Sequence, residues 1–430
     1  MPILTFYSML FRESKNLPEM DDYDAVLAFL NTFFTIHGFR NRLLFFFGSQ
    51  HVHYKLFFEH LVVLAEVGVT GHINFVFLQQ VGNLFVLLTS GVLWLLFQPR
   101  SSKLADRLLL FTPVVFLLFA PCYGDTLNWA MGSLQNLIVV FFALLCLYLL
   151  HRKESVAFFA ACVSLVSAIA SSGNGFFLAL VGLAFLWQQR HRFRMVIWTF
   201  VTLAMGGLYA YHFSAVYVSP PTVAQHPHII LALFPLAFLA AAAGRVKVCV
   251  LIALVMVGFA GYLISRRWRH LDPSTFYAGT FIIVTAIGVD LTRHQFGLEA
   301  ALVSRYCIYS QLFLCLLYMA ALRLPIDCPL TPTRARVAKR SFAVLTLLFC
   351  ISSDVREVRI LHRRTQLIRD HYVAWTRNPQ QVSLVPDEDP NLNTAWMVEF
   401  RQRAVITLKR SEELGLYYGP ASGSIASSAP

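Results

Sequence analysis

The sequence predicts an all-α fold, a polytopic transmembrane helical bundle of about ten or eleven spans. Of the 430 residues, 57% are hydrophobic and only 13% are charged, and the mean hydropathy is +0.60. A soluble domain carries about 25% charged residues. Apolar runs also recur along the chain with short polar loops between them, and about 20 apolar residues suffice to cross a bilayer. A soluble protein of this composition would have too few polar residues to cover its surface.

The apolar runs divide the chain into three regions. Residues 1–73 mix polar and aromatic side chains and are predicted to form an N-terminal region with interfacial helices. Residues 74–353 form the predicted transmembrane domain, and residues 354–430 a polar C-terminal tail whose end is disordered. The segment 1–11 is apolar but too short to span. Because an outward position of residues 12–73 requires a span before them, we expect either that a first span is missing upstream or that residues 1–11 are the remnant of it. The predicted runs lie at 74–97, 107–122, 132–150, 155–171, 175–187, 195–211, 229–243, 248–264, 273–290, 304–322 and 341–353.

Loop charges predict the orientation. Sixteen Lys and Arg residues lie in five loops, at 98–107, 151–154, 188–194, 265–270 and 323–340. The alternating loops, 123–131, 171–175 and 212–228, contain none. By the positive-inside rule the first set is cytoplasmic, and the second set faces outward together with residues 12–73 and the tail.

One apolar run does not fit this alternation. Two runs, 229–243 and 248–264, lie between an outward loop and a cytoplasmic loop, where a single crossing is required. The first contains Pro235 and ends in four alanines and Gly244. We therefore predict that 229–243 is a half-helix that does not cross the membrane and forms a cavity wall, because irregular backbone at membrane depth needs protein or water beside it.

The formal charge of +12 does not indicate nucleic-acid binding, because the basic residues lie in short clusters between apolar runs. The chain contains eight cysteines but no CxxC motif and no Cys/His cluster. No metal site is therefore predicted from the residues themselves.

Polar residues on the predicted outer side are the candidates for a functional site, since such groups beside a membrane usually face a cavity or a partner. Asp21, Asp22 and Asp24 lie near the start of the N-terminal region and could supply a general base. Acidic residues at a helix N-terminus would look the same. Arg305, at the outer end of a span, could hold a phosphate or anchor the helix by pairing with Glu299 or Asp290.

Further polar and aromatic residues on that side are candidates for substrate binding. The stretch around His53 could equally be an interfacial amphipathic helix, and the glycines beside Asn174 could serve only a tight turn. The predicted substrate-binding residues are His53, Asp125, Asn128, Trp129, Gln135, Asn174, Arg293, Arg305 and Tyr306.

These elements resemble the GT-C superfamily of polyprenyl-phosphate-sugar-dependent glycosyltransferases, and more closely a group of bacterial polytopic proteins related to it. The resemblance runs through most of residues 18–322. It is carried by the His53 region, residues 128–135, Ser172-Gly173-Asn174-Gly175 and Ala301-Leu302-Val303-Ser304-Arg305-Tyr306. The related proteins have an acidic residue and an arginine around the outer-loop histidine, where this chain has Val52 and Tyr54.

The resemblance implies a multi-pass protein of the bacterial inner membrane that transfers a sugar from a polyprenyl-phosphate donor to an acceptor at the outer face. An aspartate would be the base, and Arg305 or Arg293 would neutralise the leaving phosphate. The resemblance leaves room for a divalent cation, and it implies membrane lipid but no particular protein as a partner. A transporter or lipid flippase without chemistry, and a cell-envelope assembly protein, remain alternatives, because all three classes share this composition.

Overall fold

The computed structural model describes the chain except for residues 53, 99–102, 215–226, 324–331, 387–394 and 421–430. The described chain is helical and has no strands, only two isolated bridges between single residue pairs. The α-helices are α1 (Pro2–Glu13), α2 (Phe29–Thr35), α3 (Phe39–Gly48), α4 (Phe57–Thr70), α5 (Phe75–Leu96), α6 (Leu104–Leu118), α7 (Ala130–Leu150), α8 (Ser155–Ser171), α9 (Gly175–Gln188), α10 (Arg192–Ala210), α11 (Pro227–Leu239), α12 (Val246–Ser265), α13 (Trp268–Leu271), α14 (Pro273–Arg293), α15 (Cys307–Arg323), α16 (Pro332–Arg377) and α17 (Ala395–Glu413).

The chain is an all-α, multi-pass membrane protein. Among the described residues, six helices are long and apolar enough to cross a membrane, and three shorter apolar helices accompany them. The six are Phe75–Leu96, Ala130–Leu150, Arg192–Ala210, Val246–Ser265, Pro273–Phe296 and Ser304–Arg323, and the shorter three are Ser155–Ser171, Gly175–Gln188 and His228–Leu239. Each predicted apolar run coincides with a helix or with part of one. The count of ten or eleven spans stays a prediction.

Helix α11 covers most of the run expected to be a half-helix. It has 13 residues and contains Pro235, and a 3-10 turn (Ala241–Ala243) follows it. At about 1.5 Å per residue the helix is about 20 Å long, well short of a hydrocarbon core of about 30 Å. The backbone then turns at Gly244, which has a φ of +70°. The length agrees with the predicted half-helix.

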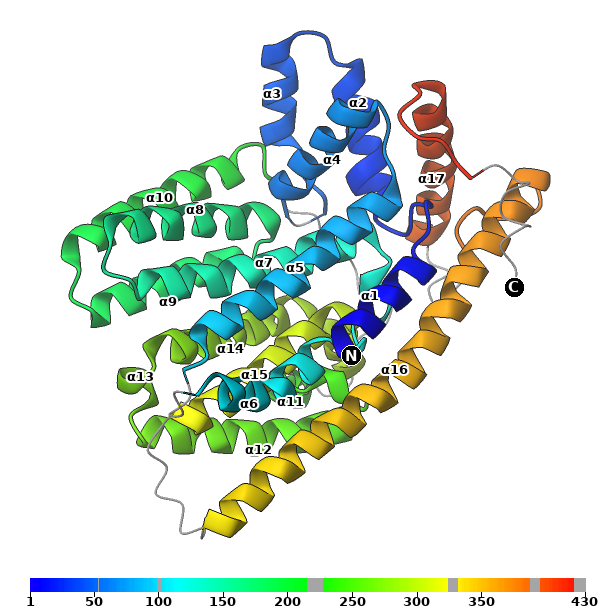
Figure 1. Ribbon diagram of the computed structural model, residues 1–430. Coiled ribbons are helices and arrows are strands. Elements are labelled where there is room, and N and C mark those ends of the chain that lie inside the picture. Colours follow the sequence, from blue (N-terminus) through cyan, green and yellow to red (C-terminus); the bar gives the residue numbers. More distant parts are fainter. Residues whose placement is uncertain (53, 99–102, 215–226, 324–331, 387–394, 421–430) are drawn as a thin grey trace.

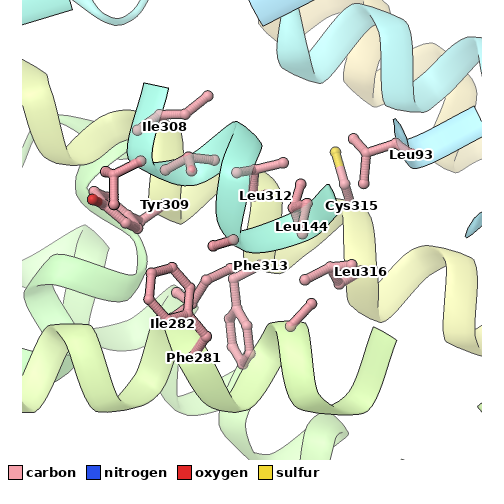
Figure 2. Packing of buried hydrophobic residues seen from close by; sticks show 14 of the residues in the cluster. Leu93, Leu144, Phe281, Ile282, Ile308, Tyr309, Leu312, Phe313, Cys315 and Leu316 are labelled. Atoms are coloured by element: carbon pink, nitrogen blue, oxygen red, sulfur yellow. The ribbon is translucent and has the colours of Figure 1, made fainter. Parts of the chain in front are cut away.

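The membrane helices pack around one large apolar core. Figure 2 shows Leu312, Phe313 and Leu316 of α15 gathered with Leu144 of α7 and Phe281 of α14. All five side chains are at most 2% exposed. Lipid supplies little hydrophobic drive for helix association, so close packing of this kind is what holds such helices together.

A second apolar core lies where a group of helices that we call the cap meets the ends of α5, α7 and α8. The cap consists of the π-helix η1 (Tyr23–Ala28), helices α2 to α4, helix α17 and the last turns of α16. In Figure 1 the blue N-terminal helices and the red helix α17 stand together at one end of the bundle. Asn31 Nδ2 donates to the Thr407 carbonyl, and Tyr417 Oη donates to the Asn16 carbonyl, at 3.0 and 2.8 Å. The two ends of the chain therefore build one structure.

The loops predicted to share a side of the membrane do come together. At the end that we call the basic end, Arg194 donates to the carbonyls of Arg152 and Lys153, and Arg269 donates to Gln188. At the other end, Asp125 contacts Ser304, which follows α14, and Asn174 contacts Tyr309. Most of the third loop without basic residues, 212–228, lies outside the described residues. Three of the five basic loops, 151–154, 188–194 and 265–270, thus contact one another, and the side of the membrane that they face stays a prediction.

Helix α16 crosses the predicted boundary between membrane domain and tail. It runs without a break through 46 residues, past residues 353 and 354, so its length is about 70 Å. Figure 1 shows it along the outside of the bundle from the basic end to the cap. Most of residues 354–413 is helical rather than an irregular tail, and the end expected to be disordered, 421–430, lies outside the described residues.

Gly175 allows the close approach of α8 and α9. A Cβ atom at this position would lie 2.5 Å from the carbonyl of Ala168. We expect Gly175→Ala to lower the free energy of unfolding by about 1–3 kcal/mol, because backbone must move to admit the methyl group. Thermal unfolding in detergent measures this. Gly206→Ala is the matched control, since nothing lies within 4 Å of its Cβ position, and an equal loss in both variants would contradict the packing argument.

Candidate functional site

Asp21 lies at the base of the cap, facing His51. His51 Nε2 is 3.7 Å from Asp21 Oδ1, and 28% of the Asp21 side chain remains exposed. Burial raises the pKa of Asp21, but contact with His51 and the charges of Arg305 and Arg293 outweigh it, so that the pKa falls below its ordinary value. Asp21 is therefore an ionised carboxylate at neutral pH, and it is reachable from outside the protein.

A tight turn from His51 to Tyr54 holds the side chains opposite Asp21. The N–H of each of these two residues donates to the carbonyl of the other, at 2.9 and 3.0 Å, and Val52 takes a positive φ of 48° between them. Lys55, the next residue, helps to hold the turn in place, because its ammonium group donates to the carbonyls of Phe47 and Tyr211. The charge of Asp21 helps to raise the pKa of Tyr54, after burial as the larger cause, and Arg305 and Arg293 act on the same phenol in the opposite direction.

Arg293 and Arg305 supply the positive charge at this site. Arg293 ends α14, and Arg305 lies just before α15, where its guanidinium carbon is 5.4 Å from the centre of the Tyr306 ring. Tyr306 packs in turn on Phe238 of α11, with ring centres 4.8 Å apart. Among the described residues neither arginine has a carboxylate within ion-pair distance, including Asp290 and Glu299. Two partly buried guanidinium groups without a carboxylate ion pair among the described residues thus act electrostatically on Asp21 and Tyr54.

Asp22 is the buried neighbour of Asp21 and differs from it chemically. Its side chain is fully buried, and its two oxygens accept from the backbone N–H groups of Met131 and Glu19, at 2.9 and 3.1 Å. Burial raises the pKa of Asp22 to about 8 despite these two hydrogen bonds. The pKa values of the two adjacent carboxyl groups therefore shift in opposite directions, which favours the ionised form of Asp21 and the neutral form of Asp22. Sites that use an acid and a base together show the same divergence.

Two further polar groups beside the site are buried without a hydrogen-bond partner in the described structure. Trp129 is 8% exposed and packs near Tyr54, and its indole N–H makes no hydrogen bond. Glu59 on α4 is 1% exposed, and neither carboxyl oxygen has a partner. Burial, with smaller contributions from Asp22 and Asp21, raises the pKa of Glu59 well above its ordinary value. Buried polar groups are rarely left unpaired, so these two mark the site as unusual.

Asp125 and Asn128 tie the site to α16 rather than face it. Arg364 Nη1 lies 3.1 Å from Asp125 Oδ2, and the other oxygen of Asp125 accepts from Ser304. The Asn128 amide lies 3.0 Å from Thr365 Oγ1. Because Ser304 adjoins Arg305, this contact sets the position of one arginine of the site. Both residues act as positioning groups in this arrangement.

The other predicted residues are placed as follows. Asp24 points towards α17, where its carboxylate is 3.4 Å from Arg403, so it does not join Asp21. Gln135 is buried in α7, one turn beyond Met131. Asn174 donates to Tyr309 Oη at 2.6 Å, behind Tyr306. His53 lies outside the described residues.

Three residues that sequence reasoning missed hold the loop before Asp21. Lys15 Nζ lies 2.6 Å from Glu19 Oε2, and Arg364 Nη2 lies 2.6 Å from Glu19 Oε1. The side chains of Lys15 and Glu19 are at most 3% exposed. Burial raises the pKa of Glu19, but the two cations outweigh it and lower the pKa overall. The four-residue spacing of Lys15 and Glu19 was a visible signal of pairing, whereas the partner in the tail was not.

Within the described ranges, no three His, Cys, Asp or Glu side chains are grouped so as to hold a metal ion. Comparison of the sequence with models of protein families finds no match, and comparison with curated proteins finds no match either. The chemistry of the site must therefore be argued from its own residues.

The raised pKa of Asp22 predicts a pH-dependent stability. A carboxyl whose pKa is higher folded than unfolded favours folding while protonated, so its contribution falls as pH rises from about 4, the unfolded value, towards about 8. We expect the melting temperature in detergent to fall over this window, and to fall less steeply in Asp22→Asn. Asp24→Asn is the control and should keep the full slope. An unchanged slope in Asp22→Asn would show that Asp22 is ionised when folded.

Proposed function

We propose that the protein is a GT-C-like glycosyltransferase of the bacterial inner membrane, which transfers a sugar from a polyprenyl-phosphate donor to an acceptor hydroxyl at the cap end of the bundle. The observation that supports the proposal is an ionised, partly exposed Asp21 whose pKa is lowered in part by the charges of Arg293 and Arg305, which have no carboxylate partner among the described residues. A base and a phosphate clamp are the two groups that this reaction needs.

In the proposed reaction, the acceptor hydroxyl gives its proton to the Asp21 carboxylate while its oxygen bonds to the anomeric carbon of the sugar. The bond between that carbon and the donor phosphate breaks, and the polyprenyl phosphate leaves with the electron pair. Arg293 and Arg305 balance the charge that develops on the leaving phosphate. Trp129 offers an apolar face and an unused N–H donor to the sugar.

The test is transfer of labelled sugar from a polyprenyl-phosphate donor in proteoliposomes. We expect Arg305→Gln and Arg293→Gln each to lower the turnover rate by about 100-fold or more, because a charge-stabilising donor is lost. Arg305→Lys should recover part of the rate, since it keeps the charge but loses the paired N–H groups.

Arg377→Gln, at the exposed end of α16, is the matched control and should transfer sugar at the wild-type rate. If the wild-type protein moves the donor across the bilayer without transferring its sugar, the protein is a flippase and the proposal is wrong. Equal rates in Arg305→Gln and Arg377→Gln would remove the arginine clamp from the mechanism.

A further inference from the structure

A hollow of about 660 Å³ follows one face of α16, away from the site described above. The spacing of the lining residues places them along a single stripe of the helix. Those described are Leu348, Ile351, Ser352, Val355, Arg356, Arg359, Ile360 and Arg363.

The residues that line the hollow change from apolar to basic along the helix. Leu348 and Ile351 lie in the apolar run 341–353 and are 56% and 49% exposed. Arg359 and Arg363 follow two to three turns later and are exposed as well. An apolar half and a cationic half are thus separated by about 12–18 Å along the axis. This pattern matches an amphiphile that has an anionic head.

Two of the three arginines that line the hollow form no ion pair among the described residues. In the described structure, no carboxylate lies within ion-pair distance of Arg359 or Arg363, whereas Arg356 pairs with its neighbour Glu357 at 3.3 Å. The residues that fasten this part of α16 to the protein lie on another face: His362 contacts Glu13, and Arg364 contacts Glu19. Arg359 and Arg363 are four residues apart, so both can reach one phosphate.

The position of these arginines in the sequence, directly after an apolar run, also favours an anionic partner. The apolar run 341–353 has basic residues before it, as the positive-inside rule expects, and a second basic group directly after it. An apolar run embedded in a bilayer places the basic residues that directly follow it among the lipid headgroups. Anionic headgroups attract such residues, and long basic side chains beside an apolar helix reach to the interface to meet them.

We propose that this face of α16 binds an anionic phospholipid of the surrounding bilayer. One acyl chain lies along Leu348, Ile351 and Val355, and the phosphate lies between Arg359 and Arg363. This inference is independent of the proposed transfer reaction, because none of these residues belongs to the site around Asp21.

The test is lipid binding to the purified full-length protein, measured by native mass spectrometry with phosphatidylglycerol and phosphatidylcholine as probes. We expect phosphatidylglycerol to bind more tightly, and the double variant Arg359→Gln/Arg363→Gln to weaken it by about thirtyfold, as two interfacial basic residues are lost. The control is Arg377→Gln/Arg410→Gln, which removes the same charge from exposed positions elsewhere and should bind as the wild type does.

Equal binding of the two lipids, or equal loss in both double variants, would overturn the proposal. Loss of binding only in Arg359→Gln/Arg363→Gln, with an unchanged melting temperature, supports it. Arg359→Lys/Arg363→Lys keeps both charges and should retain most of the affinity for phosphatidylglycerol. If its affinity falls as far as that of the Gln variant, the charge of the arginines does not explain the binding. If polyprenyl phosphate binds there in preference to phosphatidylglycerol, the occupant is the donor lipid, and this assignment is wrong.

Discussion

Replacing Asp21 by Asn should reduce sugar transfer by about 10²–10⁴-fold, because a positioned general base contributes a factor of this size. Asn has nearly the shape of Asp and keeps an oxygen towards His51, but it cannot take the proton of the acceptor. The measurement is the initial rate of transfer from a polyprenyl-phosphate donor in proteoliposomes. The affinity for the donor should change little, because the phosphate contacts that we propose lie on Arg293 and Arg305.

Asp24→Asn is the matched control, since this carboxylate faces Arg403 on α17 and should be dispensable. Asp22→Asn separates the two adjacent acids. If it abolishes transfer while Asp21→Asn remains active, the base is Asp22 and the assignment made from exposure and pKa is reversed. Full activity in both variants would remove these carboxylates from the mechanism.

Replacing Lys15 by Met should lower the free energy of unfolding by about 3–5 kcal/mol, the usual cost of leaving a buried charge without its partner. The Glu19 carboxylate is buried between Lys15 and Arg364, so the variant leaves it half-compensated. Thermal unfolding in detergent measures the loss. Adding Glu19→Gln in the same chain should restore part of it, because the stranded charge is then removed.

The control for this variant is Arg410→Met, which breaks an ion pair with Glu413 whose side chains are 50% and 65% exposed. Exposed pairs contribute less than about 1 kcal/mol, so its melting temperature should stay close to that of the wild type. If Lys15→Met has the same melting temperature as Arg410→Met, the Glu19 carboxylate is hydrated in solution and the argument from burial is wrong.

The membrane helices could be predicted from the sequence because lipid burial is a property of local composition. The run predicted at 74–97 is α5 (Phe75–Leu96), and that at 132–150 lies within α7. The alternation of loop charges likewise predicted which loops meet, as Arg194 and Arg152 do. Both patterns depend on residues that lie close together in the chain, so they can be recognised from the sequence alone.

The site was only partly predictable, because its chemistry depends on contacts between distant segments. Asp21 and Asp22 are equivalent in the sequence, and they differ because the fold buries Asp22 completely while Asp21 stays partly exposed beside His51. Arg364 was counted as part of a polar tail, since a residue that pairs across 345 positions and one that faces water have the same local pattern. The continuity of α16 past residue 353 was missed for that reason: its polar half looked like solvated chain.

The cap imposes an order on how the chain is completed during synthesis. Its core joins Tyr23 and Leu30 from the first helices to Phe400 and Leu408 of α17, which leave the ribosome almost four hundred residues later. Contacts of such long separation form late, and apolar surfaces that wait for them are open to wrong partners in the meantime. The early helices must therefore remain unpaired, or held by the membrane surface, until the end of the chain arrives. A nascent chain stopped before residue 395 would carry the membrane bundle but not a closed cap.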